Sequence, residues 1–264
     1  MSEFILKNAR RVAGSRYARP FRSAMSAVGI DDRVECLYSA MFIRDGTVIN
    51  QRVGGATAKF HVNSLEELGR VNPVPGAGRP KLRELLEQTE PDDVFWEVGA
   101  NVGVVSCLVG DRLDDGRVIA FEPHPENATR LRENLSLNDV DGTVYEYVLS
   151  DSDGHIDLAV SGNVVGAGGH SVGNRDAVKK IQVPMSSGDI FIKREEVQPP
   201  KVLYVDAEGA ELRIIEGLSS TLESGTCRYV ICSVHAGESG NSIRDFGDTP
   251  EELHVRLDGF GFDL

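Results

Sequence analysis

An apolar run that ends in an acid and two glycines constrains this chain more than any other feature. The run begins at Val94 and continues through Glu97-Val-Gly99-Ala-Asn101-Val-Gly103 into a segment of helical character. Glycine allows a turn with positive φ and removes the Cβ atom where another group must come close. The free amide groups at the start of a helix favour a carboxylate or a phosphate. The pattern therefore predicts a strand, a tight turn and a helix that together form a nucleotide-cofactor loop.

The glycine spacing separates two classes of cofactor. A dinucleotide-binding loop carries Gly-x-Gly-x-x-Gly, and the third glycine is absent here. The spacing favours S-adenosylmethionine, with its methionyl carboxylate at the helix start and its ammonium facing Glu97. The alternative, that Gly99 and Gly103 serve only a tight strand-to-helix turn, stays open at this point.

A second acid follows a second apolar strand. Residues 117–121 form the predicted strand, and Glu122 comes directly after it, 23 residues beyond Gly99. A carboxylate about 20 residues beyond the glycine loop is where a Rossmann-like fold binds ribose hydroxyls. The spacing of leucines and alanines then predicts a helix over residues 126–140.

Two further strands also end in polar residues. Residues 143–149 form the expected third strand, after which Ser150 and Asp151 either meet the adenine edge or make a plain turn. The fourth expected strand, residues 201–205, ends at Asp206, which is followed by a helix. Acids at a helix start also suit the helix macrodipole without any chemistry.

Three motifs resemble those of one enzyme family. They are Glu97-Val-Gly-Ala-Asn-Val-Gly103, Phe121-Glu-Pro-His-Pro125 and Val205-Asp-Ala-Glu-Gly-Ala-Glu211. Over roughly residues 79–264 the chain resembles the FkbM family of class I S-adenosylmethionine-dependent methyltransferases. The resemblance implies an α/β, Rossmann-like fold with a mostly parallel seven-stranded sheet and helices on both faces. It also implies methyl transfer to an oxygen, often on a sugar or a secondary metabolite, with the cofactor bound by Glu97, Gly99, Asn101 and Glu122.

Three features depart from this family pattern. Most members carry Asp at the position of Glu97, a change that keeps the negative charge. Many carry Lys two residues before the motif aspartate, where this chain has Tyr204. The sequence ends at Leu264, where the last strand of such a sheet would only begin, so we expect that strand to be truncated.

The ends of the fourth and fifth strands supply the catalytic candidates. His235 follows the apolar run that starts at Tyr229, and this fifth strand should neighbour the fourth, so we expect His235 to face Asp206 across the pocket. A hydroxyl acceptor must lose a proton, and a positioned base contributes typically ~10²–10⁴-fold. We therefore predict His235 as the base and Asp206 as the group that orients it or holds the acceptor. The alternatives are a histidine that only caps the strand and a metal held by Asp206, Glu208 and His235, but we expect no metal.

Composition narrows the substrate and the setting. The chain of 264 residues has a formal net charge of -13, and arginine outnumbers lysine 21 to 7. The negative charge argues against a nucleic-acid partner, because non-specific binding depends on neutralising phosphates. An acidic surface that is poor in lysine is typical of a protein kept soluble in high salt, so we predict a halophilic source.

Cysteine spacing and hydropathy indicate the compartment. Cys36, Cys107, Cys227 and Cys232 show no metal-binding spacing. The sequence has no apolar stretch near 18 residues, and we expect no signal peptide. We therefore expect a cytoplasmic protein with reduced thiols and no transmembrane segment.

The N-terminal part predicts a separate unit. We expect residues 1–78 to form a helical and β extension with a linker, and residues 79–264 to form the methyltransferase domain. Basic residues gather within the first 22 positions, which predicts either a helical pair on the main domain or an arm that contacts anionic lipid or phosphates. Residues 47–62 predict a strand pair that turns at Gly54-Gly55. The glycine-rich segment 161–175 is either a substrate loop or a plain surface loop.

These features together predict an S-adenosylmethionine-dependent O-methyltransferase that acts on a hydroxyl or carboxylate of a carbohydrate-like or secondary-metabolite acceptor. The rival from another class is a non-catalytic protein that uses the same fold to bind or scaffold partners. A nicotinamide-dependent oxidoreductase is a further rival, which the missing third glycine disfavours. The sequence fixes neither the acceptor, a small molecule or a glycan, nor the oligomeric state.

Overall fold

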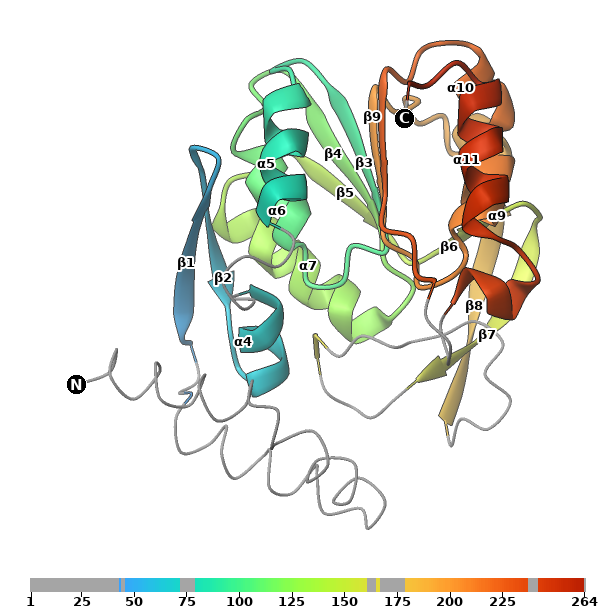
Figure 1. Ribbon diagram of the computed structural model, residues 1–264. Helices are drawn as coiled ribbons and strands as arrows, with labels where there is room; N and C mark the ends of the chain where they lie inside the picture. The colour runs from blue at the N-terminus through green and yellow to red at the C-terminus, as the bar shows by residue number, and fades with distance from the viewer. Residues whose placement is uncertain are drawn as a thin grey trace.

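The computed structural model describes residues 43, 46–71, 79–160, 165–166, 179–236 and 242–263. Its centre is a parallel five-stranded sheet in the order β10-β9-β3-β4-β5 (Figure 1). The strands are β3 (Val94–Val98), β4 (Arg117–Phe121), β5 (Gly142–Tyr145), β9 (Val202–Val205) and β10 (Tyr229–Cys232). The chain therefore has an α/β fold, and the described residues place five strands in the central sheet where seven were expected.

The central strands form where the sequence is mostly apolar, although β3 includes the acid Glu97. All residues of β3 and of β9 are buried, and parallel sheets covered on both faces have such continuous apolar strands. Alternate residues along each strand enter two separate apolar clusters, one on each face of the sheet. The predicted first, second, fourth and fifth strands are confirmed.

The predicted third strand, residues 143–149, is wrong as a single element. The chain there makes two strands, β5 in the central sheet and β6 (Val148–Ser150) in a three-stranded sheet ordered β6-β8-β7. The partners in that sheet are β7 (Gly154–Val160) and β8 (Lys179–Ser187). The two strands separate because β5 pairs with β4 whereas β6 pairs with β8, and the Tyr147 ring between them packs on Phe191 at 5.2 Å between centroids.

Helices cover both faces of the central sheet, as Figure 1 shows. One cluster includes side chains from α5 (Arg79–Gln88), α6 (Val104–Gly110) and α7 (Pro125–Leu137). The other includes side chains from α8 (Gly188–Glu195), α9 (Glu211–Gly217), α10 (Ser219–Glu223) and α11 (Pro250–Gly259), and a 3-10 turn, η1 (Ile243–Phe246), precedes α11. The helix predicted at residues 126–140 is therefore confirmed over a slightly shorter span. The helix predicted after Asp206 is split at Leu218 into α9 and α10.

A hairpin from the N-terminal part packs on the same core. It consists of β1 (Val48–Val53) and β2 (Ala56–His61), with α4 (Leu65–Val71) after it, so the predicted strand pair is confirmed. Phe60 is fully buried in the apolar cluster that also contains the sheet. The Asn138 side chain accepts from the Lys59 amide and donates to the Lys59 carbonyl, both at 2.7 Å. The basic residues of the first 22 positions lie outside the described part.

No helix within the described part of the chain is long and apolar enough to span a membrane. Three of the four cysteines, Cys107, Cys227 and Cys232, are described, and they are free thiols.

Candidate active site

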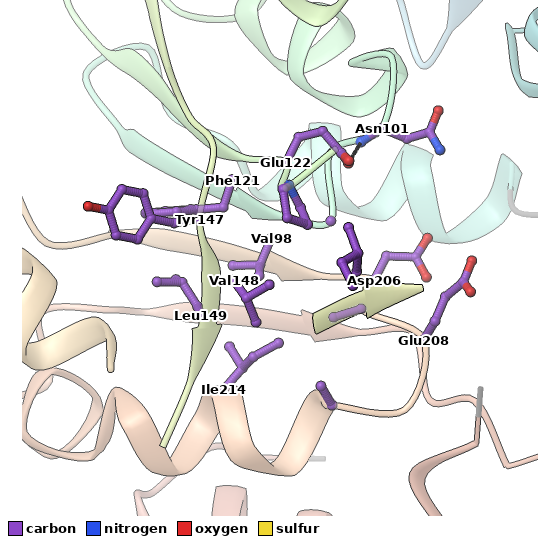
Figure 2. A pocket seen from close by; sticks show the side chains of 15 residues that line it. Val98, Asn101, Phe121, Glu122, Tyr147, Val148, Leu149, Asp206, Glu208 and Ile214 are labelled. Atoms are coloured by element: carbon purple, nitrogen blue, oxygen red, sulfur yellow. Dashed lines mark hydrogen bonds between the residues drawn. The ribbon is translucent and has the colours of Figure 1, made fainter. Parts of the chain in front are cut away.

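A hollow of about 640 Å³ opens at the carboxyl ends of β3, β4 and β9 (Figure 2). Apolar side chains form one side, and the polar ends of Asn101, Asp206 and Glu208 point together toward the other side in Figure 2. The apolar side consists of Val98, Phe121, Tyr147, Val148, Leu149, Leu158 and Ile214.

Gly99 makes the turn that brings two loops of the hollow together. It has φ 86°, and a Cβ atom there would clash with the carbonyl oxygen of Asp206. Gly103 has φ 82°, and a Cβ atom there would clash with Leu131 of α7. At both glycines the group that comes close is therefore another part of the protein and not a ligand. Gly103 is not part of the lining of the hollow.

Two other residues on the lining hold the left-handed backbone conformation without being glycine. Asn101 has φ 50° and Glu208 has φ 47°, and they come from the loops after β3 and β9. Such conformations cost of order ~1–3 kcal/mol each and tend to cluster at functional sites, although Asn tolerates them better than most residues. The strain therefore marks both loops as candidates for function.

Glu122 ties the glycine loop to the end of β4. Its Oε2 accepts from the Asn101 amide at 2.7 Å, and its Oε1 accepts from the His124 amide at 2.9 Å. Burial raises the pKa of this carboxyl to about 7, although these hydrogen bonds oppose the rise. A carboxylate oxygen has two acceptor sites, so Glu122 keeps capacity for hydroxyl donors in the hollow.

Glu97 lies behind the lining. It is 3% exposed, and its Oε2 accepts from the Ser106 amide at 2.8 Å and from the Ser106 hydroxyl. Burial raises its pKa to about 8, and the neighbouring carboxylates of Asp206 and Glu122 add to the rise. A cation brought beside Glu97 would favour its ionised form.

Asp206 and His235 meet at the polar end of the hollow, as the sequence predicted. His235 Nε2 lies 3.5 Å from Asp206 Oδ1, and the two side chains are 36% and 40% exposed. Both groups are thus open to an acceptor. His235 is not part of the hollow's lining but stands next to it, after β10.

The group that orients His235 is Glu211, which the sequence analysis did not select. Its Oε1 lies 2.7 Å from His235 Nδ1, and Glu211 is fully buried at the first position of α9. The hydrogen bond to Glu211 raises the pKa of His235, burial opposes the rise, and the charges of Asp206 and Glu208 add to it. With Nδ1 donating to Glu211, Nε2 of a neutral imidazole is free to accept a proton. The sequence signal that could have indicated Glu211 is its place as the last acid of the motif 205–211.

An ammonium lies beside Tyr204, where many family members place a lysine. Lys81 of α5 holds its Nζ 5.1 Å from the Tyr204 ring centroid and donates to Ser233 Oγ. Burial raises the pKa of Asp206, whereas His235, Lys81, Ser233 and Arg70 oppose the rise. The sequence analysis selected neither Lys81 nor Arg70, because both precede the family motifs.

Ser150 and Asp151 lie in a second hollow. Val148 and Ala210 line both hollows, so the two are neighbours. Asp151 Oδ2 lies 3.7 Å from a guanidinium nitrogen of Arg213. These two predicted residues are therefore next to the main hollow and not on its lining.

One acidic group in the described part has the spacing of metal ligands: Glu90, Asp92 and Asp93, whose ligand atoms lie within 4.8 Å of one another. Asp92 pairs with Lys201 at 2.7 Å, and Asp93 with Arg228 at 2.8 Å, so ion pairs account for two of its members. Asp206, Glu208 and His235 do not form such a group.

The lining fits S-adenosylmethionine chemically. An apolar side suits the adenine ring, the buried carboxylate of Glu122 suits ribose hydroxyls, and acids at the polar end suit a ligand with a sulfonium and an ammonium. The loop from Gly99 to Gly103 leaves the carboxyl ends of β3 and β4 open to such a ligand.

Comparison with known proteins identifies the family. Residues 97–264 match the model of the Methyltransferase FkbM domain. A curated relative, the hexuronic acid methyltransferase AglP of Haloferax volcanii, is 36% identical over 187 residues, which cover 70% of this chain and 73% of the relative.

Solved structures also match over most of the chain. An O-methyltransferase from Bacillus cereus in complex with SAH is 13% identical, with a TM-score of 0.40 over 74% of this chain and 73% of that one. Precorrin 8w decarboxylase from Methanobacterium thermoautotrophicum is 18% identical, with a TM-score of 0.42 over 73% of this chain and 75% of that one. The matched family model and the curated relative show that the chain belongs to the FkbM family of methyltransferases, with S-adenosylmethionine as its methyl donor.

Proposed function

We propose that this methyltransferase transfers a methyl group to a hydroxyl or carboxylate oxygen of a uronic-acid unit in a carbohydrate acceptor. The relative AglP is named a hexuronic acid methyltransferase, and its alignment with this protein covers most of both chains. The observation that carries the proposal is the pair of exposed groups, Asp206 and His235, beside the cofactor hollow, with buried Glu211 fixing the imidazole.

The cofactor residues follow from the geometry of the hollow. Bound S-adenosylmethionine supplies an electrophilic methyl group on a sulfonium. Glu122 would accept from the ribose hydroxyls, Glu97 would face the ammonium, and the Asn101 loop would lie against the methionyl part. The proposed cofactor residues are Glu97, Gly99, Asn101, Gly103, Glu122, Ser150 and Asp151, the last two reaching the adenine edge through the neighbouring hollow.

The chemistry of the acceptor decides what His235 does. With the cofactor bound, methyl transfer would form a C–O bond to the acceptor oxygen and break the C–S bond, whose electron pair would stay on sulfur. If the oxygen belongs to a hydroxyl, its proton passes to Nε2 of His235, whose Nδ1–H is held by Glu211. If it belongs to a carboxylate, no proton needs to be removed, and the site acts by orientation, which can supply ~7–11 kcal/mol of a barrier.

Transfer of labelled methyl to a simple uronic acid tests the proposal. The purified enzyme is incubated in high salt with methyl-labelled S-adenosylmethionine and p-nitrophenyl glucuronide, and NMR of the product separates a methyl ester from a methyl ether. Asp206→Asn should lower transfer in either case. His235→Gln should lower ether formation by ~10²–10⁴-fold and ester formation far less. His254→Gln, an exposed histidine of α11, is the matched control. Absence of label on the glucuronide would refute the proposed acceptor.

The setting of the protein belongs to the same proposal. Residues 79–264 are the catalytic domain, with the preceding residues as its extension, and the two further strands of a seven-stranded sheet stay a prediction. The acidic, lysine-poor composition supports a halophilic enzyme. A cytoplasmic location stays a prediction. Unfolding when salt is removed would support the halophilic part, and full stability in low salt would contradict it. An N-terminal arm that contacts lipid stays a prediction, as does the absence of a nucleic-acid partner.

A further inference from the structure

Two cations from helices that precede the residues matched by the family model lie close enough to the hollow for their charges to act on its acids. Arg70 is near the end of α4 and Lys81 near the start of α5, whereas the matched residues begin at 97. Both side chains belong to the part of the chain that the family motifs leave unexplained.

The contacts of Lys81 place its ammonium beside Asp206. Its Nζ donates to the Ser233 hydroxyl, and the Ser233 amide donates to the carbonyl of Val205 at 2.8 Å. The same Nζ lies over the ring of Tyr204. An ammonium has three donors, and within the described residues the Ser233 hydroxyl is the acceptor for one of them.

The contacts of Arg70 place its guanidinium on the Glu122 side of the hollow. Its Nε donates to the carbonyl of Gly166 at 2.9 Å, and the Gly166 amide donates to Asn127 Oδ1 at 2.9 Å. Asn127 is fully buried, and its side chain makes a hydrogen bond with the Glu122 carboxylate that lowers the pKa of Glu122. Arg70 is itself exposed, so its remaining N–H donors are open to a ligand.

The charge of the hollow makes these two cations significant. Three acids, Glu122, Asp206 and Glu208, are on the lining, so a ligand with its own carboxylate is repelled there unless a cation receives it. Among the described residues, His235, Lys81 and Arg70 are cationic side chains whose charges lower the pKa of Asp206 and so oppose the effect of burial. His235 is already held between two acids, which leaves the two residues from α4 and α5.

We propose that Lys81 and Arg70 bind the carboxylate of the acceptor and thereby select a uronic acid over a neutral sugar. The inference rests on the proposed function, because it requires a uronic-acid acceptor. It gives the segment before the matched domain a direct part in acceptor recognition.

Charge-removing variants of the full chain test this assignment. Lys81→Gln and Arg70→Gln are compared with Arg83→Gln, which removes the same charge from an exposed position of α5. KM and kcat are measured with p-nitrophenyl glucuronide and p-nitrophenyl glucoside, and S-adenosylhomocysteine affinity is measured by calorimetry. Each of the first two variants should raise KM for the glucuronide on the order of 10-fold, because a hydrogen bond to a charged group is lost. Lys81→Arg should restore part of the loss, and Arg83→Gln should match the wild type.

The substrate pair separates recognition from a structural effect. An equal rise of KM for glucuronide and glucoside, or an unchanged KM for the glucuronide, overturns the assignment and leaves the proposed function standing. A wild-type enzyme that methylates the glucoside as well as the glucuronide also overturns the assignment, while methyl transfer to a sugar survives. A wild-type enzyme that does not methylate the glucuronide refutes both.

Discussion

Replacement of Glu97 by Gln should remove a pH-dependent loss of stability from the cofactor-free protein. Glu97 is 3% exposed, and the Ser106 amide and hydroxyl are its hydrogen-bond donors. Burial raises its pKa from 4.5 to about 8. Gln keeps an oxygen that accepts from Ser106 but cannot ionise, so the variant isolates the charge.

The direction and size of the change in the free energy of unfolding with pH follow from proton linkage. Between pH 4.5 and about 8 the folded protein holds a proton that the unfolded chain has lost, so rising pH favours unfolding. The contribution of protonated Glu97 to the free energy of unfolding is complete below pH 4.5 and is lost as the pH rises through about 8. The difference between the two pKa values corresponds to an upper limit of about 5 kcal/mol. Glu122, whose pKa burial raises to about 7, adds a smaller loss of the same sign.

Urea unfolding at constant high salt measures this loss. The free energy of unfolding is determined at several values between about pH 5 and pH 8 for the wild type, Glu97→Gln and Glu87→Gln. Glu87 is an exposed glutamate of α5 and serves as the control. The wild type and the control should lose stability as pH rises, and Glu97→Gln should lose much less. A slope in Glu97→Gln as steep as that of the wild type would refute the reasoning.

Three further predictions test other contacts of the site and core. Glu211→Gln replaces the carboxylate that raises the pKa of His235 by a neutral amide, so with a hydroxyl acceptor the rising limb of kcat/KM should move to lower pH; an unmoved limb argues against His235 as the base. Gly99→Ala should cost about 2–4 kcal/mol in urea unfolding, because its φ is 86° and the new Cβ meets the Asp206 carbonyl; an unchanged midpoint would contradict the turn. Arg228→Gln removes the ion-pair partner of the fully buried Asp93 and should lower the free energy of unfolding by about 3 kcal/mol. Arg117→Gln breaks an exposed ion pair and should lower it by less than about 1 kcal/mol. Equal losses in the two variants would contradict this account.

The sequence predicted the central sheet where local pattern was sufficient. The mostly apolar runs at 94–98 and 202–205 are buried on both faces, and such runs form the middle of a parallel sheet. The prediction failed at 143–149, because the choice between the central sheet and the sheet with β8 depends on a partner more than 30 residues away in sequence. Apolar content alone does not carry that information.

The site residues, too, could be predicted only in part from the sequence. Glu122 and Asp206 could be predicted as neighbours because the carboxyl ends of parallel strands meet at one edge of the sheet. Ser150, the last residue of β6, and Asp151 line the adjacent hollow because β6 pairs with β8 and not with the central sheet. Lys81 and Arg70 could not be predicted, because they reach the site only through the packing of α4 and α5.

The most direct test of the account is calorimetric titration of S-adenosylhomocysteine, in high salt, into the wild type, Glu122→Gln and Glu126→Gln. Glu126 is exposed at the start of α7, four residues beyond Glu122, and serves as the control. If the hollow at the ends of β3, β4 and β9 is the cofactor site, the wild type and Glu126→Gln bind equally, and Glu122→Gln binds ~10–100-fold more weakly because a hydrogen bond to a charged group is lost. Equal binding by all three proteins, or none by the wild type, would contradict the assignment of this hollow.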